Sequence, residues 1–112
     1  MQCETNKVGN VTIFAIYGKL TFSYLGDIRE AIKKDIATAA TPKFLIDLTN
    51  MSSIDSSGLG TIVSIYKTVL SRNGTFGVLV KDKDVREVFH TIGLTKLFSL
   101  YEVQEEAIRE LQ

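Results

Sequence analysis

Residues 44–60 of this chain read FLIDLTNMSSIDSSGLG. The first five are apolar except for Asp47, which is typical of a short strand buried on both faces of a sheet. A polar loop is expected next. Asp55, Ser56 and Ser57 then lead into apolar residues at helical spacing, and Asp and Ser are favoured there because their oxygens accept the first free N–H groups of a helix. The stretch therefore predicts a strand, a loop and a helix, which is the repeating unit of a parallel α/β sheet.

The flanking sequence repeats this alternation. Gly9-Asn10 predicts a tight turn between two N-terminal strands, which makes an antiparallel hairpin. The expected strands are residues 2–8, 11–17, 44–48, 76–80 and 98–101, and the expected helices are marked by apolar stripes over residues 25–36, 59–70, 85–92 and 103–111. The order is ββαβαβαβα. It predicts one α/β domain over residues 1–112, with a mixed, mostly parallel sheet and helices packed against it.

Composition excludes several classes of function. The chain has 112 residues, with 13 Lys and Arg against 13 Asp and Glu, so no basic excess is available for a nucleic-acid backbone. The single cysteine, Cys3, and the single histidine, His90, exclude a multi-cysteine zinc site and most histidine metal sites. No apolar run approaches the ~20 residues of a membrane helix, and the first residues lack the pattern of a secretory signal. We expect a cytoplasmic protein with no membrane insertion, no nucleic-acid partner and no cofactor.

The start of the second expected helix is the candidate site. Asp55 and the serines after it have two readings: a helix cap, or a site where helix N–H groups receive an anion. Gly58 and Gly60 leave room for close approach by another backbone or a partner. The Gly-x-Ser-x-Gly elbow of serine hydrolases and the Gly-x-x-x-x-Gly-Lys-Ser/Thr phosphate loop are both absent, so we expect no enzyme activity.

Asp47-Leu48-Thr49 followed by Ile54-Asp55-Ser56-Ser57-Gly58-Leu59-Gly60 resembles the signature of STAS domains, particularly that of bacterial anti-sigma factor antagonists. Gly18-Lys19-Leu20 resembles the Gly-x-Leu that follows the second strand of that family. Weaker matches continue to the C-terminal helix, at Asn73-Gly74, Val78-Leu79-Val80, Ile92-Gly93-Leu94, Leu97-Phe98 and Glu106-Ala107. The resemblance covers nearly the whole chain.

The resemblance implies a partner switch. In that family the antagonist binds an anti-sigma factor that is a GHKL-type serine kinase, and this binding frees the sigma factor. Phosphorylation of the serine after the motif's Asp breaks the complex, and a PP2C-type serine phosphatase restores it. On this chain the implied phosphoacceptor is Ser56, with Ser57 as the adjacent alternative and Asp55 shaping the loop. ATP and Mg²⁺ belong to the kinase. The alternative is a STAS scaffold or accessory subunit of a stress-sensing or membrane-transport assembly.

One departure from the family pattern lies near this motif. Many members carry an Asp after Gly-x-Leu that helps contact the kinase, whereas this chain has Thr21, followed by Phe22-Ser23-Tyr24. Phe22 and Tyr24 are either core residues or exposed anchors of a different partner surface. The expected partner-binding residues are Thr21, Phe22, Tyr24, Asp55, Ser56, Ser57 and Gly58.

Overall fold

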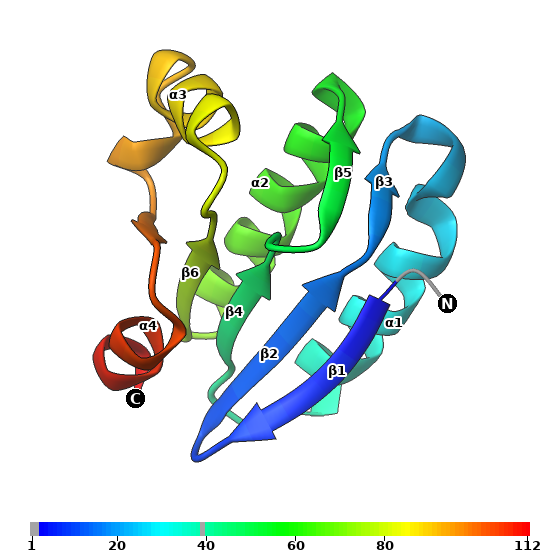
Figure 1. The fold of residues 1–112 in the computed structure, drawn as a ribbon. Coiled ribbons are helices and arrows are strands. Elements are labelled where there is room, and N and C mark those ends of the chain that lie inside the picture. The colour runs from blue at the N-terminus through cyan, green and yellow to red at the C-terminus, as the bar shows by residue number, and fades with distance from the viewer. Residues whose placement is uncertain (1–2, 39) are drawn as a thin grey trace.

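A five-stranded sheet lies at the centre of the computed structural model, which describes residues 3–38 and 40–112 (Figure 1). In spatial order its strands are β1 (Cys3–Val8), β2 (Val11–Ile16), β4 (Lys43–Asp47), β6 (Thr75–Leu79) and β7 (Ser99–Tyr101). β1 and β2 are antiparallel, and all other neighbours in the sheet are parallel. The predicted mixed, mostly parallel sheet is confirmed. Residue 2, expected in the first strand, lies outside the described residues.

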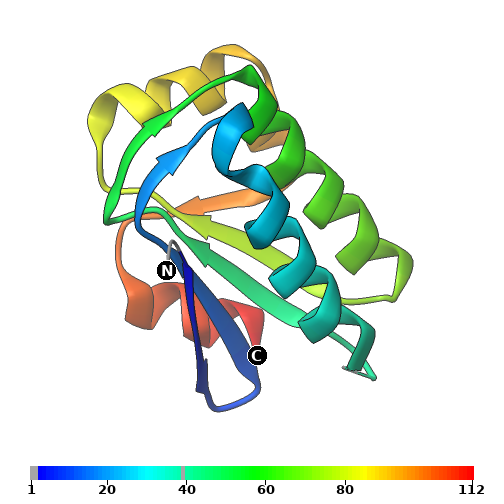
Figure 2. The same ribbon diagram turned by 90° about the vertical axis from the view of Figure 1, so that its right-hand side faces the viewer.

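Four helices connect or follow these strands: α1 (Leu25–Thr38), α2 (Ser56–Ser71), α3 (Lys83–Thr91) and α4 (Gln104–Leu111). The order ββαβαβαβα is therefore confirmed for the elements of the main sheet. Figure 2 shows α1 and α2 side by side on one face of the sheet and α4 on the opposite face. Because the chain moves across the sheet in one direction, from β2 to β4 to β6, right-handed crossovers place α1 and α2 on the same face.

The core is divided by the sheet into two clusters. Phe44 and Ile46 of β4 belong to the larger cluster, with α1 and α2, whereas Leu45 belongs to the smaller one, with α4. All three side chains are buried, which confirms the expectation of a central strand covered on both faces. Burial of each such side chain contributes about 1.5–3 kcal/mol to folding.

A second, two-stranded sheet joins β3 (Gly18–Leu20) to β5 (Met51–Ile54) in parallel. The expectation of a plain loop between Leu48 and Asp55 was wrong here. β5 is four residues long, and its two middle serines are exposed, so it lacks the apolar alternation that marks a strand. Figure 1 shows that this small sheet continues the direction of β2 and β4 beyond their carboxyl ends and leads into α2.

The single cysteine and the single histidine lie in different environments. Cys3 is buried in the larger core cluster, and His90 is exposed on α3. Within residues 3–38 and 40–112, no group of three or more His, Cys, Asp or Glu side chains is placed to hold a metal ion. Over the same residues, none of the helices combines the length and the apolar character needed to span a bilayer.

Candidate functional site

The carboxylate of Asp55 joins two segments that are far apart in the sequence. Its Oδ1 accepts the N–H of Gly58 at 2.9 Å, which caps the start of α2. Its Oδ2 accepts the N–H of Phe22 at 3.1 Å, in the short 3-10 turn Phe22–Tyr24 that precedes α1. The hydrogen bond from Gly58 makes the largest contribution to lowering the pKa of Asp55, and the one from Phe22 makes the next largest. Together they hold this pKa below its ordinary value. The side chain is therefore ionised at neutral pH, and it fixes the turn before α1 against the first turn of α2.

Gly58 allows the backbone of β3 to lie directly against α2. A Cβ atom at this position would collide with the carbonyl oxygen of Leu20, which also accepts the N–H of Asp55 at 3.4 Å. This contact sets the distance between β3 and α2. Gly58 itself is buried, so it offers little surface to a partner. A Cβ atom at Gly60 would meet nothing within 4 Å, so of these two glycines Gly58 is the one with a close backbone contact.

The two serines at the start of α2 are not equivalent. Ser56 is the first residue of the helix and is exposed. Ser57 is half-buried, and its carbonyl oxygen accepts the hydroxyl of Thr61 at 3.0 Å. Of the two hydroxyl-bearing side chains, that of Ser56 is the more accessible to a second protein.

The turn before α1, whose backbone is bound by Asp55, carries two exposed aromatic side chains. Phe22 is 76% exposed and Tyr24 is 41% exposed, so the alternative that they are core residues does not hold. Thr21 is half-buried, and its carbonyl oxygen accepts the N–H of Tyr24 at 2.9 Å. Of the residues expected from the sequence to bind a partner, those at least partly accessible are Thr21, Phe22, Tyr24, Asp55, Ser56 and Ser57, and we call this set the partner surface.

A further contact beneath the partner surface was not predicted from the sequence. Arg29 of α1 donates from Nε and Nη2 to the hydroxyl oxygen of Thr61, at 3.3 and 3.2 Å. The Thr61 side chain is buried and continues this chain of hydrogen bonds to the carbonyl of Ser57. Arg29 and Thr61 are 32 residues apart, and nothing in the local pattern of either helix indicates that they meet.

Comparison with known proteins gives consistent results. The family model described as "STAS domain" matches residues 2–107. The anti-sigma F factor antagonist of Paenibacillus polymyxa is 26% identical over all of this chain and 96% of its own length. A Thermotoga neapolitana relative, named as an anti-sigma factor antagonist homologue, is 36% identical over 70 residues, which are 62% of this chain and 62% of that relative.

Among solved structures, the Bacillus cell fate determinant SpoIIAA in its phosphorylated form superposes with a TM-score of 0.75. The match covers 98% of this chain and 99% of SpoIIAA at 22% sequence identity, so it shows a shared fold. The family-model match extends from the hairpin strands into α4 and includes the Asp55-Ser56-Ser57-Gly58 segment. The chain therefore belongs to the STAS domain family.

Proposed function

We propose that this protein is an anti-sigma factor antagonist that binds an anti-sigma factor and is released when Ser56 is phosphorylated. The anti-sigma factor is proposed to be a GHKL-type serine kinase, which supplies ATP and Mg²⁺. A PP2C-type phosphatase returns the chain to its binding form. The protein itself acts in the cytoplasm, has no catalytic activity and needs no cofactor.

The observation that carries this proposal is the exposed serine at the first residue of α2, beside an ionised Asp55, in a chain of the STAS family. Ser56 is favoured over Ser57 because Ser57 is half-buried in the first turn of the helix. Relatives named as anti-sigma factor antagonists, and a protein of the same fold solved in a phosphorylated form, support the assignment.

A phosphate at Ser56 would change the partner surface more than the fold. It adds a charge of about −1.5 to −2 at the positive end of α2, where helix N–H groups and the dipole stabilise an anion. The free protein should therefore stay folded. A bound partner would have to exclude water from this charge next to the carboxylate of Asp55, which raises the free energy of the complex.

Phe22 and Tyr24 supply apolar area for the same interface. Asp55 holds the backbone of Phe22 against the start of α2, so the turn that carries the two aromatic residues has a fixed position relative to the helix start at Ser56. Aromatic residues that protrude next to a polar centre are typical of interface anchors. We infer that these side chains take over part of the contact that an Asp at the position of Thr21 makes in other family members.

The test begins with capture of the partner from a cell lysate on immobilised protein carrying Ser56→Ala, which we expect to bind the kinase without release. The captured kinase and ATP are then added to the wild type and to Ser57→Ala, with Ser56→Ala as the control, and the phosphorylated residue is mapped by peptide mass spectrometry. We expect phosphate on Ser56 in both proteins and none on Ser56→Ala. Phosphate on Ser57 alone would show that the acceptor is wrongly assigned.

Capture of transport or stress-sensing subunits without a kinase would favour the scaffold alternative. An ATPase or esterase activity that follows the purified protein and disappears in Ser56→Ala would contradict the absence of catalysis.

A further inference from the structure

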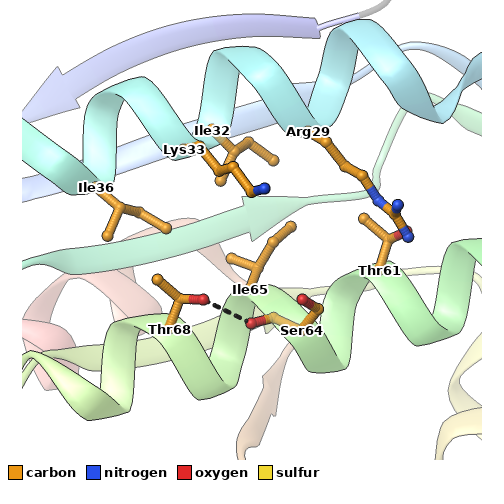
Figure 3. Close-up of a pocket in the computed structure, with 8 residues that line it drawn as sticks. All are labelled: Arg29, Ile32, Lys33, Ile36, Thr61, Ser64, Ile65 and Thr68. Carbon is orange, nitrogen blue, oxygen red and sulfur yellow. Dashed lines mark hydrogen bonds between the residues drawn. The ribbon is translucent and has the colours of Figure 1, made fainter.

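A cavity of about 150 Å³ lies between α1 and α2, separate from the partner surface. Figure 3 shows its lining side chains pointing toward one another across the gap between the two helices. Four come from α1 and four from α2: Arg29, Ile32, Lys33, Ile36, Thr61, Ser64, Ile65 and Thr68. The cavity begins one helical turn beyond Ser57, on the side of the molecule that α1 and α2 cover.

The floor of this cavity is apolar. Ile32, Ile36 and Ile65 are all buried members of the larger core cluster. A volume of about 150 Å³ is large enough for one benzene-sized molecule. The floor therefore fits a compact apolar group of about six carbon atoms.

The rim of the cavity is positively charged. Arg29 and Lys33 lie one turn apart on α1, and Figure 3 shows Arg29 reaching Thr61 of α2 while Lys33 stays close to α1. Arg29 donates to the hydroxyl of Thr61, and Thr68 uses its own hydroxyl to donate to the carbonyl of Ser64. None of the eight lining residues is acidic. Two cations above an aliphatic floor attract a group that is negatively charged at one end and apolar at the other.

We propose that the groove between α1 and α2 binds a small organic anion, with a compact apolar body on Ile32, Ile36 and Ile65 and a carboxylate or phosphate toward Arg29 and Lys33. Binding at this site does not depend on the proposed partner switch. Its residues are distinct from the partner surface, so failure of one assignment leaves the other intact.

The test is a titration of the ¹⁵N-labelled full chain followed by amide chemical shifts. The probes are benzoate and phenyl phosphate, which distinguish the two anionic groups. Benzyl alcohol lacks the charge, and inorganic phosphate lacks the apolar body. We expect at least one aromatic anion to give saturable shifts in residues 29–36 and 61–68, with benzyl alcohol and inorganic phosphate at least about tenfold weaker.

Matched variants test the geometry. Lys33→Gln removes a charge from the rim and should weaken binding about fivefold, whereas Lys34→Gln, one residue further on, removes an equal charge outside the cavity lining and should leave binding unchanged. Ser64→Leu, at an exposed position, should fill the groove and abolish binding while the protein stays folded.

The proposal is overturned if neither aromatic anion saturates by ~20 mM, or if benzyl alcohol or inorganic phosphate binds equally well. Equal weakening by Lys33→Gln and Lys34→Gln would also overturn it, because the effect would then reflect overall charge.

Discussion

Truncation of Phe22 separates interface energy from folding energy. The side chain is 76% exposed, so only about a quarter of it contributes to the folded state. Full burial of a Phe is worth about 3–5 kcal/mol when the residue is cut to Ala, which gives an expected folding cost for Phe22→Ala of about 1 kcal/mol. The melting temperature should fall by no more than about 4–8 °C.

The expected effect of Phe22→Ala on binding is larger. An aromatic side chain buries about 150–250 Å² in full, so covering the exposed 76% of Phe22 removes about 110–190 Å² from water. At ~25 cal/mol per Å² the upper limit is about 3–5 kcal/mol. Interface anchors commonly lose at least 2 kcal/mol on truncation, and this loss corresponds to a roughly 30-fold weaker complex with the kinase.

Titration calorimetry with the captured kinase measures the affinity, and differential scanning calorimetry measures the stability. Leu70→Ala is the control for an exposed apolar side chain, since Leu70 is 54% exposed near the other end of α2. Phe89→Ala is the control for a core residue, since Phe89 is fully buried. The reasoning is refuted if Phe22→Ala binds the kinase as tightly as the wild type, or if it loses as much stability as Phe89→Ala.

Three other predictions concern the contacts that hold the partner surface in place. Gly58→Ala should lower the free energy of unfolding in urea by about 1–3 kcal/mol or more, because its Cβ meets the Leu20 carbonyl. Gly60→Ala is the control and should raise the free energy of unfolding by about 0.5–1 kcal/mol. Equal effects of the two substitutions would contradict the close contact at Gly58. Asp55→Asn should lower the melting temperature at pH 7. Since the pKa of Asp55 in the folded state lies below its unfolded value, the difference in melting temperature between wild type and Asp55→Asn should shrink as the pH falls below about 4. A difference that persists at low pH would show that the ionised carboxylate is not what stabilises the fold. Thr61→Val should cost about 1 kcal/mol of unfolding free energy, because it removes the hydroxyl that links Arg29 to the Ser57 carbonyl; an unchanged stability would show that this link is unimportant.

The main sheet could be predicted from the sequence because its signals are local. The continuous apolar run at residues 44–48 and the spacing of Leu25, Ile28, Ile32 and Ile36 each reflect burial of one strand or one helix face. The apolar stripe of α3 predicted burial less well, since Phe89 is buried but Val88 and Ile92 remain about half exposed. α3 packs at one end of the sheet, so only part of its stripe is covered (Figure 1).

The arrangement of the site could be predicted only in part. Asp55 as a helix cap followed from residue preference, and the structure confirms it. The second hydrogen bond of Asp55, to Phe22, joins residues 33 apart through the backbone, and a backbone donor leaves no mark in the sequence. The pairing of β3 with β5 is also made by main-chain groups, and the two segments are only three and four residues long, so neither shows the alternation on which strand prediction depends.

The central claim is that phosphate on Ser56 breaks the complex without unfolding the protein. The most direct measurement compares the affinity of the kinase for the unmodified chain and for the chain carrying phosphoserine at position 56, with circular dichroism recorded on both. We predict an affinity lower by roughly a hundredfold, which is ~3 kcal/mol, and unchanged secondary structure. Equal affinities, or loss of binding that accompanies loss of helical signal, would contradict the claim.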